Sequence, residues 1–238
     1  MKLITRIIEP KKVTVIWQAP ENGSGYPIGK RLVVGEIRNE GGKTWLKYYN
    51  NQDTEEAVKQ GFTGLTSYPY EPDKEFNGTL LDVLSKRVPP SSRTDYENYL
   101  RSYRISPHAE GISVLSLLAY TTGEIAGDGF TFLHSFEDAQ PPFDFTIQIA
   151  GFRYNGLKVF SNPNVLQDKQ VAFVLENSNP HDKDAVAITC EGQTLGYVPR
   201  GLTGVVRTLM ARYKVSTSVE RINGTLDRPN IFIFVEVR

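Results

Sequence analysis

Six short runs of β-branched and aromatic residues fill much of residues 145–238, and this pattern constrains the fold more than any other feature of the chain. Turns rich in Gly, Asn and Pro separate the runs, as is typical of strands. The runs cover residues 145–150, 171–176, 185–190, 194–198, 215–221 and 231–237, and a helical pattern covers residues 202–213. Short strands with frequent turns and one or two helices predict a small, mostly-β, OB-like barrel.

The first part of the chain has a different order of elements. Strand-like runs come first, at residues 3–8, 13–17, 32–37 and 44–49. Helical patterns follow at residues 55–60, 79–86, 95–104 and 113–120, before a strand at 130–133. Asp53 and Thr94 are the expected N-caps of two of these helices. Strands followed by helices predict an α+β domain.

The segment SFEDAQPP, residues 135–142, separates the two patterns. Consecutive prolines cannot continue a helix and favour extended backbone. We therefore expect an α+β domain over residues 1–136, a linker over 137–144 and the small barrel over 145–238.

Composition excludes several classes of protein. Cys190 is the single cysteine, and with three histidines the chain offers neither an internal disulfide nor a Cys/His zinc cluster. The sequence has no run of about 18 apolar residues, so it predicts no transmembrane helix. We expect a cytoplasmic protein without a metal or cofactor. Residues 145–238 hold 11 basic and 8 acidic residues, a small surplus that permits a local contact with nucleic acid.

Three polar elements of the barrel sequence are candidates for binding. Arg153 and Tyr154 follow a strand, between glycines that allow a sharp loop. A tyrosine at a loop tip offers a face on which a base stacks for ~1–3 kcal/mol, and Arg153 would neutralise a phosphate. The alternative is that Tyr154 packs over the end of the barrel.

The second and third elements lie further along the chain. Residues 179–185 read NPHDKDA, a polar turn between two strands, and include Asn179, His181, Asp182 and Lys183. The alternative is an Asx-turn that only shapes the hairpin. Residues 196–200 read GYVPR, with Tyr197 and Arg200, and Arg207 follows two helical turns later on a face that the two arginines would share. The alternative is a solvated helix N-terminus.

In this order, the three elements resemble the HIRAN domain, a small β-barrel module. The resemblance covers residues 145–238 and implies capture of the free 3′ end of single-stranded DNA. It implies that Asp182 accepts the terminal sugar hydroxyl and that Tyr197 and Arg200 approach the DNA backbone. The sequence departs from the family at His181, where a stacking tyrosine is usual, and at Asn155, where a second aromatic residue often follows the loop tyrosine.

Residues 12–134 resemble, distantly, the N-terminal subdomain of HipA-type toxin kinases. The resemblance rests on the order of VVGEIR (residues 33–38), WLKY (45–48), FNGTLL (76–81) and a tyrosine-rich helix. Kinase catalytic motifs are missing from the sequence, and the glycine-rich loop at residues 123–129 lacks the Lys and Ser/Thr of a phosphate loop.

The sequence therefore predicts a non-catalytic, two-domain bacterial or phage protein. Its C-terminal domain would bind single-stranded DNA or DNA ends, and its N-terminal domain would bind protein. The alternative is a protein-binding, antitoxin-like regulator of a HipA-like kinase, with little or no DNA binding.

Overall fold

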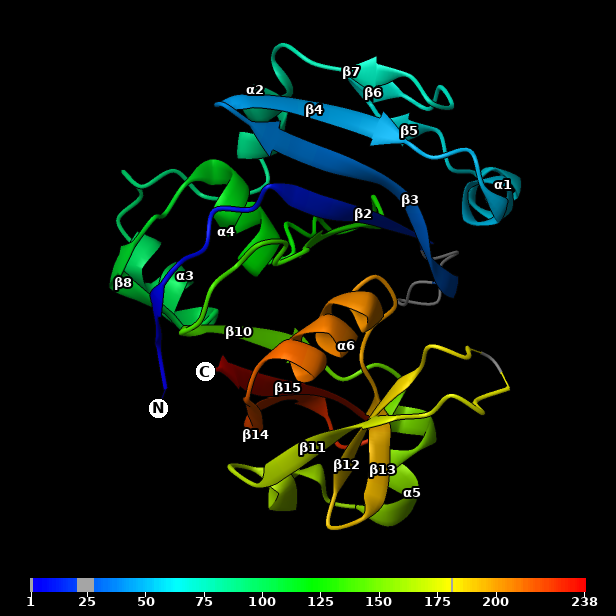
Figure 1. Ribbon diagram of the computed structural model, residues 1–238, viewed down its shortest axis with the longest axis vertical. Coiled ribbons are helices and arrows are strands. Elements are labelled where there is room, and N and C mark those ends of the chain that lie inside the picture. The colour runs from blue at the N-terminus through cyan, green and yellow to red at the C-terminus, as the bar shows by residue number, and fades with distance from the viewer. Residues whose placement is uncertain (1, 21–27, 181) are drawn as a thin grey trace. The chain divides into compact units, whose positions relative to one another are not determined.

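The computed structural model describes residues 2–20, 28–180 and 182–238 (Figure 1). The chain divides into two compact units. The N-terminal unit comprises residues 7–103 and 107–139. The C-terminal unit comprises residues 140–238 together with two segments from earlier in the chain, one that ends at Arg6 and one at Arg104–Ser106. The sequence analysis did not anticipate these two segments in the C-terminal unit.

An antiparallel sheet with the strand order β7-β4-β3-β2-β9 forms the centre of the N-terminal unit. Its strands are β2 (Lys12–Ala19), β3 (Ile28–Glu40), β4 (Lys43–Tyr48), β7 (Glu75–Phe76) and β9 (Phe130–His134). The strands β3 and β4 approach closely at Gly35, where a Cβ atom would lie 2.5 Å from the Lys47 carbonyl oxygen. A residue with a side chain would therefore push these strands apart.

Four short helices accompany this sheet: α1 (Gln52–Lys59), α2 (Leu80–Ser85), α3 (Tyr96–Ser102) and α4 (Val114–Tyr120). Strands predominate among the described residues of the unit, so the predicted α+β description is not confirmed. The strand β8 (Ile105–Glu110) and the short strands β5 (Gly64–Leu65) and β6 (Tyr68–Pro69) were not expected either.

The helix caps differ from the sequence expectation. The N-cap of α1 is Asn51, whose side chain accepts a hydrogen bond from the Thr54 amide over 3.0 Å. Asp53, the predicted cap, lies inside the helix, and its carboxylate accepts from the Val33 amide over 2.9 Å. The N-cap of α3 is Asp95 rather than Thr94, and it makes no side-chain capping bond.

Aromatic side chains fill the core of the N-terminal unit. Tyr48 is fully buried, and its hydroxyl donates to the Tyr68 carbonyl oxygen over 2.9 Å and accepts from the Leu65 amide over 2.8 Å. Burial raises the pKa of Tyr48 to about 12. The ring of Phe62 lies 5.4 Å from that of Trp17 and 5.6 Å from that of Tyr48. These contacts hold the β5–β6 hairpin against the sheet.

The C-terminal unit is a curled β half-barrel, and the predicted small β-barrel is confirmed. Its strand order is β10-β15-β14-β11-β12-β13. The strands are β10 (Phe143–Gln148), β11 (Gln170–Leu175), β12 (Val186–Cys190), β13 (Gln193–Tyr197), β14 (Val215–Thr225) and β15 (Arg228–Val237). Apolar side chains of these strands, among them Phe143, Phe234 and Val235, are almost fully buried.

The two edges of this sheet meet at one point. Ala150, two residues beyond β10, forms an antiparallel bridge with Tyr197 at the end of β13, through N···O distances of 2.8 and 2.9 Å. A Cβ atom at the neighbouring Gly196 would lie 2.3 Å from the Ala150 carbonyl oxygen. Glycine is therefore required there for the edges to approach.

Short helices connect the strands of the half-barrel. After β10 come η1 (Phe152–Tyr154), α5 (Gly156–Val159) and η2 (Pro163–Leu166), none of which was expected, and α6 (Thr203–Arg212) precedes β14. Among the described residues, β11 pairs with β14 at only two positions, Gln170 and Val171. The barrel wall is thus open beyond Val171.

The two early segments complete the C-terminal unit. Ile4 in β1 (Ile4–Arg6) is 1% exposed, and its amide donates to the Arg104 carbonyl oxygen over 2.6 Å. The Arg104 guanidinium forms an ion pair with Glu220 of β14, with side-chain exposures of 18% and 6%. This unit consequently contains side chains that the stretch 145–238 does not supply.

No helix among the described residues has the length and apolar content to cross a membrane.

Candidate nucleic-acid interface

The first predicted element forms a tight turn of 3-10 helix beyond β10. Gly151 adopts a φ of 72°, and the buried Phe152 anchors the turn to the barrel. Tyr154 is 63% exposed. The Arg153 Nη2 donates to the Tyr154 hydroxyl over 3.1 Å, and its guanidinium lies 4.9 Å from the centre of the ring. The tyrosine therefore projects from the barrel with its cation alongside, rather than packing over the barrel end.

The second element is an Asx-turn. The Asp182 Oδ1 accepts from the Asp184 amide over 2.9 Å, and the Asp182 amide donates to the Asn179 Oδ1 over 3.2 Å. The Asx-turn, which the sequence analysis gave as the structural alternative for this segment, is therefore present. Asp182 and Lys183 are exposed, and the Asp182 Oδ2 has no hydrogen-bond partner in the part of the chain that the structure describes. His181 lies outside the described residues.

Glu176 joins the second element to the third. Its Oε2 accepts from the Asn179 Nδ2 over 3.0 Å and from the Tyr197 hydroxyl over 3.1 Å. Partial burial raises the pKa of Tyr197, and the Glu176 charge raises it further. The sequence analysis missed Glu176; its only signal was an acidic side chain where an apolar strand enters a polar turn.

The two predicted arginines have different positions. Both Nη atoms of Arg207 donate to the Asn177 Oδ1 over 3.3 Å, and Nη1 also reaches the Asp184 carbonyl oxygen at 3.5 Å. Arg207 therefore braces the loop at both of its ends. Arg200 is exposed and precedes α6, which begins at Thr203, so the expected helical face shared by Arg200 and Arg207 is wrong.

The β14–β15 hairpin adds a surface that the sequence analysis did not identify. Its tip holds Leu226, which is 61% exposed, and Asp227. The Thr225 hydroxyl donates to Asp227 over 2.6 Å, and this hydrogen bond is the largest of the effects that lower the pKa of Asp227. The charge of Arg153 also lowers it. The hairpin tip thus lies within electrostatic reach of the Arg153–Tyr154 turn.

Backbone pairing brings these elements to neighbouring positions. The Ala150–Tyr197 bridge pairs the end of β13 with Ala150, which comes three residues before Arg153 in the chain. The Ile149 amide donates to the Ile231 carbonyl oxygen over 2.8 Å, which fixes the same turn to β15. The structure therefore joins Tyr197, Asn179 and Glu176 directly, and it places the Arg153–Tyr154 turn beside this group. Among the described residues, no group of three or more His, Cys, Asp or Glu side chains is placed to hold a metal ion.

Comparison with known proteins identifies the class of the C-terminal unit. Residues 142–237 match the family model of the HIRAN domain. These residues form a HIRAN domain, as the resemblance predicted.

Two solved structures are similar over the same region. The HIRAN domain of human HLTF is 18% identical over 40% of this chain and 74% of that chain, with a TM-score of 0.33. A protein from Lactobacillus plantarum is 20% identical over 38% of this chain and 91% of that chain, with a TM-score of 0.31. No curated protein matches the chain. The resemblance of residues 12–134 to HipA-type kinases gains no support from these comparisons.

Proposed function

We propose that the HIRAN domain of this protein binds single-stranded DNA at a free 3′ end. The carrying observation is the exposed ring of Tyr154, held beside the Arg153 guanidinium at the point where the two edges of the half-barrel meet. A base that stacks on an exposed aromatic ring gains ~1–3 kcal/mol. A cation next to that ring neutralises the phosphate of the stacked nucleotide.

The polar loop supplies the proposed selectivity for an end. The exposed Asp182 carboxylate keeps one oxygen for a ligand while the other shapes the turn. A carboxylate accepts a charge-assisted hydrogen bond from a sugar hydroxyl, and it repels a phosphate at the same distance. Asn179 and Lys183 flank this position, and His181 would stack on the terminal base.

Glu176 and Arg207 act in this proposal as positioning residues. Glu176 holds the Tyr197 hydroxyl and the Asn179 amide, and Arg207 holds Asn177 and Asp184. A loop restrained before binding loses less conformational entropy when the ligand arrives. Arg153 and Arg200 are the residues left to contact phosphates. The proposal assigns the domain a binding role and no catalytic step.

The test is a titration of fluorescently labelled strands with this chain, in which fluorescence anisotropy measures binding. The strands are a single strand with a 3′-hydroxyl, the same strand with a 3′-phosphate, a blunt duplex and the matching RNA. We expect the 3′-hydroxyl strand to bind most tightly. Equal binding of the two single-strand ends would reject end recognition. No binding of any strand would favour the alternative, a protein-binding regulator of a HipA-like kinase, which co-purification with such a kinase would then test.

A further inference from the structure

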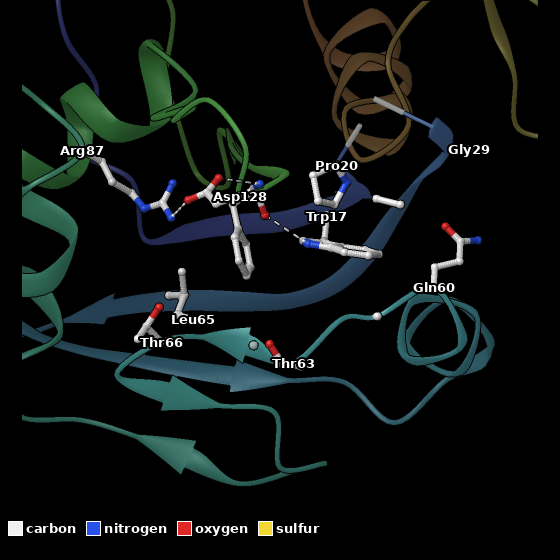
Figure 2. A pocket seen from close by; sticks show the side chains of 13 residues that line it. Trp17, Pro20, Gly29, Gln60, Thr63, Leu65, Thr66, Arg87 and Asp128 are labelled. Carbon is white, nitrogen blue, oxygen red and sulfur yellow. Dashed lines mark hydrogen bonds and ion pairs between the residues drawn. The ribbon is translucent and has the colours of Figure 1, made fainter. Parts of the chain in front are cut away.

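A pocket of about 600 Å³ lies in the N-terminal unit, between the end of β2 and the segment that joins α1 to β5 (Figure 2). Its volume is in the range of small-molecule sites. The pocket belongs to neither the HIRAN domain nor the proposed DNA interface.

Among the described residues, the pocket wall carries no uncompensated charge. Arg87 and Asp128 are the charged side chains that line it, and they form an ion pair with each other. The Arg87 side chain is 6% exposed, donates to the Gly123 carbonyl oxygen over 3.0 Å and lies over the Phe130 ring at 5.5 Å. A phosphate or carboxylate would have to compete with Asp128 for this cation. The pocket therefore favours an uncharged ligand.

The remaining wall combines a small apolar surface, the 4% of Trp17 that is exposed, with available hydrogen-bonding groups. The Trp17 Nε1 donates to the Asp128 carbonyl oxygen over 3.2 Å, so the indole offers the pocket only carbon atoms. The hydroxyls of Thr63 and Thr66 are exposed and have no hydrogen-bond partner among the described residues. The Asp128 side chain is 30% exposed, and each carboxylate oxygen accepts one hydrogen bond, from Arg87 and from the Phe130 amide. A carboxylate has about four lone-pair sites, so both oxygens keep acceptor capacity.

This combination distinguishes between ligand classes. An extended peptide would need a free strand edge, but β2 is paired on both sides, with β3 and with β9. Gly61, on the opposite wall, has open space where a Cβ atom would lie, which leaves room for a ring. A planar ring with alternating donors and acceptors on its edge fits a neutral wall that offers hydroxyls and a carboxylate.

We propose that this pocket binds an uncharged nitrogen heterocycle of nucleobase or nucleoside size. The ring contacts the exposed edge of Trp17, its N–H groups donate to Asp128, and its acceptors receive hydrogen bonds from Thr63 and Thr66. A phosphate on the sugar adds nothing to the affinity, because the described residues of the wall hold no free cation for it.

Trp17 itself reports on the test. The chain has two tryptophans, and Trp45 on β4 does not line the pocket. The Trp45→Phe variant of this chain therefore carries one tryptophan, which lies in the pocket wall. It is titrated with adenosine, guanosine, cytidine and thymidine, and then with the 5′-monophosphate and 5′-triphosphate of each. We expect a saturable change in Trp17 emission with at least one nucleoside, at a dissociation constant on the order of 0.1 mM for a ligand of this size.

Matched variants assign the signal to the pocket. Thr63→Leu, and separately Thr66→Leu, add apolar volume at exposed positions and should weaken nucleoside binding about tenfold or more. Thr94→Leu makes the same change at an exposed threonine outside the pocket and should leave binding unchanged. Tyr154→Ala, in the HIRAN domain, should also leave it unchanged. Circular dichroism verifies that each variant is folded.

Three results would overturn the proposal. The first is the absence of a saturable signal with every nucleoside at about fifty times the expected dissociation constant. The second is undiminished binding in both folded pocket variants, or loss of binding in Tyr154→Ala. The third is a triphosphate that binds about tenfold more tightly than its nucleoside, which would show that the site selects an anion.

Discussion

The Tyr197 hydroxyl donates a hydrogen bond to the Glu176 Oε2 over 3.1 Å, and this contact joins the end of β13 to the start of the polar loop. The same oxygen accepts from Asn179. Two residues that the sequence placed in separate elements thus share one acceptor that the sequence analysis did not select. Four predictions concern this arrangement and the groups around it, and a fifth concerns His134 in the N-terminal unit.

Glu176→Gln should lower the pKa of Tyr197, because the charge of Glu176 contributes to raising it. The amide oxygen is also uncharged, so the hydrogen bonds that it accepts from Tyr197 and Asn179 are weaker than those to the carboxylate. We expect single-strand affinity to fall by about 1 kcal/mol, the value of a typical hydrogen bond. A carbon-13 titration of the tyrosine rings measures the pKa. Glu191→Gln, on the β12–β13 turn, is the control and should leave the Tyr197 pKa unchanged. An unchanged Tyr197 pKa in Glu176→Gln would refute the contact.

Tyr154→Ala should weaken single-strand binding by ~1–3 kcal/mol, the stacking contribution of one aromatic ring. Tyr154→Phe keeps the ring and removes only the hydroxyl that accepts from Arg153. We therefore expect the phenylalanine variant to retain most of the affinity. Anisotropy titrations compare the two. If both variants lose affinity equally, the hydroxyl rather than the ring face carries the interaction.

Arg153→Gln and Arg207→Gln should differ in their salt dependence. Arg153 is exposed beside Tyr154, so its loss should lower the slope of log K against log salt by roughly 0.7, the value for one phosphate contact to a single strand. Arg207 is occupied by Asn177 and Asp184. Its replacement should reduce affinity by loosening the loop while leaving the slope nearly unchanged. Titrations at several salt concentrations test this, and equal slope changes would place Arg207 on the DNA.

Asp182→Asn should narrow the difference in affinity between a 3′-hydroxyl and a 3′-phosphate strand. An amide accepts from a hydroxyl and also donates to a phosphate, whereas the carboxylate only accepts. The Asx-turn survives the change, since the amide oxygen still accepts from the Asp184 backbone. Asp184→Asn, two residues further along the same exposed loop, is the matched control. A difference that persists in Asp182→Asn would assign end recognition to another group.

Stability should fall as pH decreases from about 6.5 to about 4, because His134 is buried in its neutral form. The His134 Nδ1 accepts from the Phe136 amide over 2.8 Å, and its Nε2 lies 2.9 Å from the Ile8 carbonyl oxygen, which defines one neutral tautomer. Burial lowers the pKa of His134 to about 4. The unfolded chain takes up a proton in this window and the folded chain does not, so stability is full above the unfolded pKa and declines as pH falls. The loss for about 2.5 pKa units is on the order of 3 kcal/mol.

Denaturant unfolding between pH 4 and pH 7.5 measures the His134 effect. His134→Gln should be less stable at neutral pH and should show a flatter dependence on pH. His108→Gln changes an exposed histidine and should leave the dependence as it was. A His134→Gln protein with the original pH dependence would assign the effect to other groups.

The sequence alone determined the strands of the half-barrel and the identity of its polar loops. Runs of β-branched and aromatic residues between turns predicted all six strands of the C-terminal sheet, and a helical pattern predicted α6, because these preferences are local to each segment. The order of the Arg153–Tyr154 turn, the 179–185 turn and the 196–200 segment was sufficient to indicate a HIRAN domain.

Only the tertiary structure decided which side chains meet. Glu176 looked like the solvated end of a strand, and Arg207 looked like a phosphate ligand, until the fold gave each of them partners in the loop between them. Arg104 appeared to end a helix, but it is paired with Glu220, 116 residues away. The pocket at Trp17 likewise draws its walls from five separate segments. Such contacts depend on long-range packing and on the balance of burial and charge, which a local pattern of residues does not encode.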